Sequence, residues 1–274
     1  MDKIALVTGA SAGIGWDIAS YLNKKGFTVV AAARRLEKMS ALQDEGIYTV
    51  SLDISDSDSI DNALADIREN VGEIDILVNN AGVMYMAPAE LAELDEIRHL
   101  YNVNFFGLIE LTQKCLAHMR AQQWGRVLNV TSVGGLVSMP FNSVYQSGKF
   151  ALEGWSRGLK QEVRKFGIGV STIRPGSIKS EIYDTTFAAE EDSYDWAGPY
   201  KEDFVRVLNQ LEAFGNQYGS EPACISELVY EAITSESPRV GYIGPTRIEE
   251  ILHKDMRTLT EDERDARVAE TWGM

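Results

Sequence analysis

The chain has 274 residues, of which 45% are hydrophobic and 24% charged, the composition of a globular protein with a substantial core. Its formal net charge of −15 opposes non-specific binding to nucleic acid and to anionic membranes, so we expect neither as a partner. No apolar run reaches the ~18 residues of a membrane span, and no signal-peptide pattern is present. We therefore expect a cytoplasmic protein without a membrane span.

The cysteines and histidines indicate neither a disulfide framework nor a metal centre. Cys115 and Cys224 are the only cysteines, which argues against a disulfide scaffold. The three histidines, at positions 99, 118 and 253, lack the spacing of metal ligands. We expect no metal site.

Short runs rich in β-branched residues alternate with longer helical patterns along the chain. The runs are mostly continuous in apolar residues, as is typical of parallel strands covered on both faces. We therefore predict an α/β fold: a single domain over residues 1–274, with a doubly wound parallel sheet of about seven strands and helices on both faces. The predicted strands are residues 3–7, 28–32, 48–52, 74–78, 126–131, 169–173 and 241–243. The predicted helices begin near Ile14, Leu36, Asp56, Glu90, Val144 and Glu221.

A glycine-rich turn follows the first predicted strand directly. The residues from Thr8 to Gly15 read T-G-A-S-A-G-I-G and lead into a helix. Glycines permit a tight turn and a close approach of the backbone to a ligand, and a helix N-terminus presents free N–H groups to a pyrophosphate. The position of the turn, between a strand and a helix, predicts a dinucleotide site.

The second predicted strand ends at Ala33-Arg34-Arg35. In sites that bind NAD, an acidic residue near this point takes the ribose 2′-hydroxyl, and none is present here. Guanidinium groups suit a 2′-phosphate, which they can bind bidentately. We therefore favour NADP(H) over NAD(H), with Arg34 as the phosphate ligand because Ala33 occupies the usual acidic position.

Tyr145 and Lys149 stand four residues apart, and Ser132 lies thirteen residues upstream of the tyrosine. On a helix this spacing puts the tyrosine and the lysine on one face. A phenol has a pKa of about 10, which a nearby ammonium and a positively charged nicotinamide would lower. The alternative is an amphipathic surface pair, because Y-x-x-x-K also occurs by chance. The predicted cofactor site favours a proton donor and acceptor set for alcohol–ketone interconversion.

An aromatic segment follows the sixth predicted strand, with eight aromatic residues among the 36 from 183 to 218. One reading is an excursion that packs on the body or on a partner subunit. The other is a lid over an apolar substrate, which we place at about residues 180–219.

The chain ends in a densely charged extension at about residues 245–274. Thr260 and Glu263 have the spacing of a capping box, which predicts a short final helix. We expect this helix to be solvated or to form an interface, and nothing in it suggests chemistry.

In the order of its motifs, the chain resembles the short-chain dehydrogenase/reductase family over nearly its whole length, to about residue 245. The resemblance implies a Rossmann-like fold. The matching motifs are T-G-x-x-x-G-x-G at Thr8–Gly15, Leu52-Asp53-Ile54, Asn79-Asn80-Ala81-Gly82, Asn104, Ser132, Tyr145-x-x-x-Lys149 and Pro175-Gly176.

The resemblance implies four catalytic residues. Tyr145 would be the acid and base, and Lys149 would lower its pKa and bind the nicotinamide ribose. Ser132 would orient the substrate oxygen. Asn104 would hold a water that links Lys149 to solvent, although it could instead be a buried structural amide.

The resemblance also implies the cofactor contacts. Asp53 would bind the adenine, unless it only caps the turn before the next helix. Ser180 stands where relatives usually have threonine, and it keeps the hydroxyl. The implied cofactor-binding residues are Gly9, Ser11, Gly13, Ile14, Gly15, Arg34, Arg35, Asp53, Ile54, Asn80, Ala81, Gly82, Tyr145, Lys149, Pro175, Gly176, Ile178 and Ser180.

We expect an oxidoreductase that transfers a hydride between NADP(H) and a small-molecule carbonyl or secondary alcohol. The bulk of the candidate pocket residues suggests a sizeable apolar ketone, such as a steroid, retinoid or fatty carbonyl. The alternative is an NADP(H)-binding sensor or regulator without turnover. The candidate substrate residues are Met84, Tyr85, Ser132, Met139, Phe141, Tyr145 and Tyr183.

The resemblance further implies a homodimer or homotetramer. Relatives commonly pair two helices across a four-helix interface, and the corresponding segments here run from Phe105 to Met119 and from Leu152 to Val163. The small residues Ser147, Gly148 and Ala151 would allow these helices to approach closely.

Overall fold

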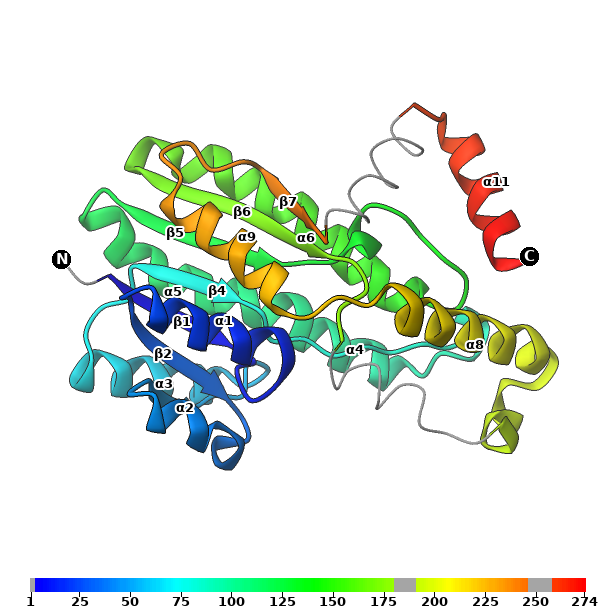
Figure 1. Cartoon of the computed structure of the whole chain (residues 1–274), viewed down its shortest axis with the longest axis horizontal. Coiled ribbons are helices and arrows are strands. Elements are labelled where there is room, and N and C mark those ends of the chain that lie inside the picture. The colour runs from blue at the N-terminus through cyan, green and yellow to red at the C-terminus, as the bar shows by residue number, and fades with distance from the viewer. Residues whose placement is uncertain (1–2, 180–190, 246–257) are drawn as a thin grey trace.

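The computed structural model describes residues 3–179, 191–245 and 258–274 (Figure 1). Within them, seven strands form one parallel sheet, which confirms the predicted fold class. The predicted and observed strands overlap in every case, with ends that differ by a residue or two. The strands are β1 (Ile4–Thr8), β2 (Thr28–Ala33), β3 (Tyr48–Ser51), β4 (Ile76–Asn79), β5 (Gly125–Val130), β6 (Ile168–Pro175) and β7 (Gly241–Gly244).

The order of the strands across the sheet is β3-β2-β1-β4-β5-β6-β7. The first three strands lie on one side in the order β1, β2, β3, and the chain then crosses back and places β4 on the other side of β1. The connections on the two sides of β1 therefore run to opposite faces, and a crevice opens beyond the carboxyl ends of β1 and β4. This topology predicts where a ligand binds before any side chain is considered.

Alternate residues of the strands enter two separate cores, because successive side chains point to opposite faces. On β1, Ala5 and Val7 pack with Ile18 of α1, whereas Leu6 packs with Leu111 of α5 on the other face. Helices thus cover both faces of the sheet (Figure 1). The helices are α1 (Gly13–Lys24), α2 (Ser40–Asp44), α3 (Ser57–Asn70), α4 (Leu94–Tyr101), α5 (Gly107–Ala121), α6 (Ser143–Val163), α8 (Lys201–Tyr218), α9 (Ala223–Thr234) and α11 (Glu261–Trp272).

Two helix starts differ from the predicted ones. The helix predicted from Glu90 begins at Leu94, and a short 3-10 turn at Ala89–Leu91 precedes it. The segment after Arg35 opens as a 3-10 turn before the short helix α2. The helix predicted to begin near Asp56 is α3, and the side chain of Asp56 caps it by accepting a hydrogen bond from Asp58 N.

The described parts of the aromatic segment and of the charged extension lie at the carboxyl end of the sheet (Figure 1). The described part of the aromatic segment forms a 3-10 stretch, Glu191–Tyr200, and then α8. In the extension, the capping box of Thr260 and Glu263 opens α11 as expected. Arg206 of α8 donates a hydrogen bond to the carbonyl of Trp272, so the two helices touch. Among the helices that the structure describes, none is both long and apolar enough to cross a membrane.

Candidate active site

A cavity of about 1090 Å³ opens at the carboxyl end of the sheet. Its volume slightly exceeds that of a typical ligand pocket, as expected for a site that holds two molecules. One end is formed by the β1–α1 turn and the other by α8 and α11. The cavity brings together most of the sequence-predicted site residues: Gly9, Ser11, Gly13, Ile14, Arg34, Arg35, Asp53, Ile54, Asn80, Ala81, Gly82, Met84, Ser132, Met139, Tyr145, Lys149, Pro175, Gly176 and Ile178.

The glycine turn leaves space that any other residue would fill. Gly9 has a φ of +68°, and a Cβ there would lie 2.8 Å from Cα of Ala81. A Cβ on Gly15 would overlap the carbonyl of Gly9, although Gly15 itself does not line the cavity. Ala12 is the N-cap residue of α1, and no side chain accepts a hydrogen bond from the first turn of the helix. The backbone N–H groups of that turn are therefore left for a ligand in the cavity. Such a cradle fits a diphosphate.

Asn80 holds the glycine turn against the end of β4. Its side-chain amide donates to the carbonyl of Thr8 at 3.0 Å. In return, the hydroxyl of Thr8 accepts from the backbone N–H groups of Asn80 and Ala81, both at 3.0 Å. These bonds connect β1 and β4 at the switch point of the sheet.

Two arginines line the same end of the cavity. Arg35 donates to the hydroxyl of Ser11 at 3.2 Å, which draws its guanidinium toward the glycine turn. Asp53 lies opposite and accepts from Ser55 N at 2.9 Å, so it both caps its turn and lines the cavity. Burial raises the pKa of Asp53, but the hydrogen bonds from Ser55 and the charge of Arg34 lower it to a net value below its usual range.

Tyr145 and Lys149 lie one turn apart on α6, as their spacing predicts. The Nζ of Lys149 is 5.5 Å from the centre of the Tyr145 ring and donates to the carbonyl of Val130 at 3.0 Å. Lys149 is only 5% exposed, and burial lowers its pKa to about 8 against the opposing charge of Glu153. Ser132 follows β5, and its hydroxyl accepts from Gly134 N at 3.0 Å. All three side chains line one cavity.

Asn104 does not line the cavity, and its side chain is hydrogen-bonded to the backbone of Val83. Its amide donates to the carbonyl of Val83 and accepts from the N–H of Val83, both at 2.8 Å. It lies in a π-helical stretch, Asn102–Phe106, between α4 and α5. A Cβ on Gly82 would lie 3.4 Å from Asn104 Oδ1 and 3.8 Å from Lys149 Nζ, so Asn104 remains close to the lysine.

Only some of the candidate substrate residues line the cavity. Met84 and Met139 line the cavity, whereas Phe141 does not: its ring packs edge-on against Phe204 at 5.4 Å. Tyr85 also lies away from the cavity. The predicted site residues Ser180 and Tyr183 lie outside the described residues.

Several lining residues have no motif in the sequence. Gln146 is buried beside Tyr145, and its side-chain oxygen accepts from Met139 N at 2.8 Å. Leu211 lines the cavity from α8, beside Phe214, which belongs to the aromatic segment that the sequence offers as a lid. Residues 267, 268, 271 and 272 of α11 line it as well. The extension, in which we saw no chemistry, therefore forms part of the site.

No cluster of three or more histidine, cysteine, aspartate or glutamate side chains within the described ranges could hold a metal ion. The site residues instead fit a phosphorylated dinucleotide: a glycine cradle, an uncapped helix start and two arginines. The cavity continues from this end to Tyr145 and Lys149 and then to an apolar outer wall.

Comparison with known proteins identifies the family. The model of the short chain dehydrogenase family matches residues 3–191. The chain is 32% identical over 221 residues to the NADPH-dependent 1-acyldihydroxyacetone phosphate reductase of Schizosaccharomyces pombe, which covers 78% of this chain and 74% of that protein.

Solved structures agree with this assignment. A short-chain dehydrogenase from Streptomyces avermitilis has a TM-score of 0.82 and 29% identity, with 98% of this chain and 96% of that chain covered. The closed form of a serine dehydrogenase complexed with NADP+ has a TM-score of 0.77 and 26% identity, with coverages of 89% and 95%. The chain belongs to the short-chain dehydrogenase/reductase family and is an NADP-dependent oxidoreductase.

Proposed function

We propose that the protein transfers a hydride between NADP(H) and a sizeable apolar ketone or the matching secondary alcohol. The observation that carries this proposal is the single cavity that joins the glycine cradle and the arginines to Ser132, Tyr145 and Lys149. The cofactor, when bound, supplies the hydride chemistry. The residues of the chain bind the two molecules, orient them and move the proton.

In the reductive direction Tyr145 gives its phenolic proton to the carbonyl oxygen. Ser132 donates a hydrogen bond to the same oxygen, and the two hydroxyls stabilise the alkoxide that develops there. The ammonium of Lys149 favours the phenolate that Tyr145 becomes. Asn104 is proposed to hold a water near Lys149 that returns the proton from solvent, with its amide fixed by Val83.

The cofactor end is assigned to the residues that line it. Arg34 binds the 2′-phosphate with support from Arg35, and Asp53 meets the adenine while it caps its own turn. The first turn of α1 takes the diphosphate. Pro175, Gly176 and Ile178 flank the nicotinamide, and Gly176 is held by a 2.7 Å hydrogen bond to the carbonyl of Gly244.

The outer wall of the cavity supports an apolar substrate. Apolar side chains meet there from four segments, namely the loop after β4, the loop before α6, α8 and α11: Met84, Met86, Met139, Leu211, Phe214, Val268 and Trp272. The relative from Schizosaccharomyces pombe is named a 1-acyldihydroxyacetone phosphate reductase, and the substrate in that name carries an acyl chain. We infer that α8 and α11 together act as the lid over this end, with their mutual hydrogen bond holding them closed.

The substrate class is tested by following NADPH oxidation with 2-butanone, 2-dodecanone, androstenedione and retinal. Because each buried CH₂ contributes up to ~0.8 kcal/mol, we expect kcat/KM for 2-dodecanone to exceed that for 2-butanone by about 100-fold or more. Equal values for the short and long ketones would reject the apolar class. Tight NADPH binding with no oxidation by any ketone would favour the sensor alternative.

We also propose that the protein is a homodimer or homotetramer that pairs α5 and α6. Phe106 is 57% exposed and Phe150 42%, and a Cβ on Gly154 or Gly158 would meet no atom within 4 Å. These residues offer an apolar face with room for a second helix.

The oligomeric state is measured by light scattering on the 30.4 kDa chain. We expect a dimer or tetramer for the wild type and a monomer for the double variant Phe106→Asp/Phe150→Asp, because two charges would be buried in the interface. Leu36→Asp, which changes an exposed apolar residue elsewhere, is the control. A wild-type monomer, or an unchanged mass in the double variant, would contradict this proposal.

A further inference from the structure

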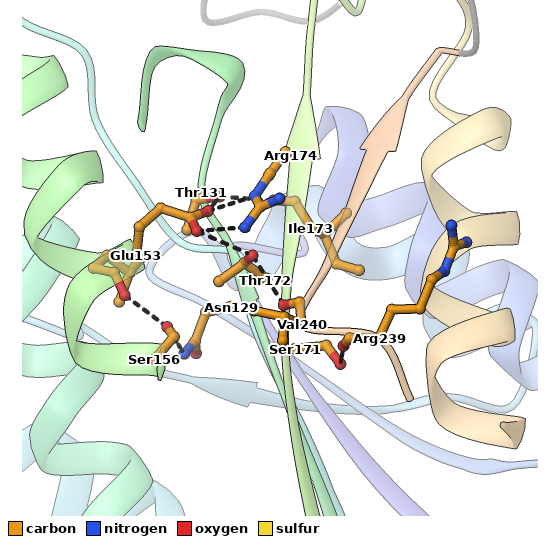
Figure 2. Close-up of polar contacts among 11 residues, drawn as sticks. Asn129, Thr131, Glu153, Ser156, Ser171, Thr172, Ile173, Arg174, Arg239 and Val240 are labelled. Atoms are coloured by element: carbon orange, nitrogen blue, oxygen red, sulfur yellow. Dashed lines mark hydrogen bonds and ion pairs between the residues drawn. The ribbon is translucent and has the colours of Figure 1, made fainter. Parts of the chain in front are cut away.

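Glu153 is a buried carboxylate one turn after Lys149 on α6, and the reaction proposed above does not use it. Its side chain is 5% exposed. One oxygen accepts from Thr131 Oγ1 at 2.7 Å and from Arg174 Nε at 2.9 Å. The other accepts from Arg174 Nη2 at 2.7 Å and from Thr172 Oγ1 at 3.3 Å (Figure 2). These hydrogen bonds, from two elements besides α6, fix the carboxylate in one orientation.

Arg174 completes the arrangement from the end of β6. Its guanidinium meets Glu153 through two parallel hydrogen bonds and is only 8% exposed in its side chain. The fold makes room for both partners. A Cβ on Gly241 of β7 would overlap the guanidinium, and a Cβ on Gly135 would lie 3.1 Å from Glu153 Cγ. The pair therefore occupies a space that two glycines leave open.

The residues bound to Glu153 are neighbours of the proposed catalytic and cofactor-binding groups. Thr131 directly precedes Ser132 at the end of β5. Arg174 directly precedes Pro175 at the end of β6. Glu153 itself shares α6 with Tyr145 and Lys149 (Figure 2 shows the convergence of the three elements).

We propose that Glu153 is a positioning residue that fixes Ser132 and the Pro175–Gly176 turn relative to Lys149, through Thr131 and Arg174. This inference rests on the catalytic roles proposed above. The side chain touches neither substrate nor cofactor: Glu153 and Arg174 do not line the cavity, whereas Thr131 does.

The charge of Glu153 also acts on Lys149. Burial lowers the pKa of the lysine, and the carboxylate opposes that effect. Among the described residues, the ionisable groups around Lys149 are Tyr145 and Glu153 on α6, with Arg174 on β6 paired to Glu153. The partners on β5 and beside β4, the Val130 carbonyl and Gly82, are uncharged. Removing the negative charge therefore lowers the pH at which the Tyr145–Lys149 couple loses its first proton.

The test is Glu153→Gln, assayed with NADPH and the panel ketone that the wild type reduces fastest. We expect kcat to fall about 10-fold or more, since a small displacement of reacting groups costs that much. We expect the alkaline limb of kcat/KM to move to lower pH by about one unit. The dissociation constant of NADPH, measured by fluorescence, should stay within about threefold, because the glycine turn and the two arginines that are assigned to the phosphates make no contact with Glu153.

A glutamine at 153 leaves Arg174 buried without a counter-charge, which can prevent folding. The double variant Glu153→Gln/Arg174→Met removes both charges and keeps the kinetic test available. Asp75→Asn is the matched control, since Asp75 is a buried carboxylate that accepts from Ile4 N at 3.0 Å at the opposite end of the sheet. It should lower Tm without moving the pH profile.

The double variant distinguishes a positioning role of Glu153 from a purely stabilising one. A reduced kcat with unchanged NADPH binding supports the positioning role, and the alkaline limb should move less than in Glu153→Gln, because the charge of Arg174 is removed together with that of the carboxylate. A wild-type kcat and pH profile, with only a lower Tm, would show that the pair merely stabilises the fold. If the wild type itself oxidises no NADPH with any ketone, the proposed function fails instead, so the two failures are distinguishable.

Discussion

Replacing Tyr145 with phenylalanine is expected to lower kcat for ketone reduction by about 10³-fold or more, within the range of lost general acid catalysis. The ring and its position over Lys149 remain, because the change removes one oxygen only. The NADPH dissociation constant should therefore change by less than about threefold. The measurements are steady-state NADPH oxidation and equilibrium fluorescence titration.

The control for this variant is Tyr101→Phe. Tyr101 also carries a hydrogen-bonded hydroxyl, which donates to Ser147 Oγ at 2.9 Å, but it does not line the cavity. It should keep wild-type kcat. Turnover by Tyr145→Phe at near-wild-type rate would refute the assignment of the proton donor.

Replacing Arg34 with aspartate is expected to reduce the preference for NADPH over NADH by about 10²-fold or more. A charge-assisted hydrogen bond contributes roughly 1.5–3 kcal/mol, and the new carboxylate would also repel a 2′-phosphate. The same carboxylate would stand ready to accept from a free 2′-hydroxyl. The ratio of kcat/KM for the two cofactors is the measurement.

Arg120→Asp makes the same change of charge at the end of α5, outside the cavity, and should leave the cofactor ratio unaltered. This control shows how far the cofactor ratio changes merely because negative charge is added to a chain with a net charge of −15. An unchanged ratio in Arg34→Asp would reject Arg34 as the 2′-phosphate ligand. A compensating role of Arg35 is then examined in the double variant, where a retained preference would exclude both arginines.

The parts of the site that could be predicted from the sequence are those encoded over a few residues. The glycine turn works through its own φ angles and the space beside Gly9 and Gly15, so its pattern is visible in eight consecutive letters. Tyr145 and Lys149 meet because a helix brings residues four apart onto one face. The strands were also visible locally, because strands covered on both faces are mostly apolar.

Other parts depend on which segments the fold brings together. Glu153 and Arg174 are 21 residues apart and sit on a helix and a strand, and no spacing rule connects them. Asn104 matched a motif, yet its amide bonds to Val83 and keeps out of the cavity, which only the return of the chain past β4 reveals. The helix expected from Glu90 began four residues later, because a 3-10 turn intervenes.

The sequence by itself determined the fold class, the cofactor type and the Tyr145–Lys149 couple, because each depends on local backbone geometry or on charge at one strand end. Only the tertiary structure decided that α11 lines the cavity together with α8. The charged surface of α11 gave no local sign of a binding role, and its contribution arises where Arg206 and Trp272 bring it against α8. Residues distant in sequence become one wall through packing and long-range hydrogen bonds, which neither composition nor periodicity encodes.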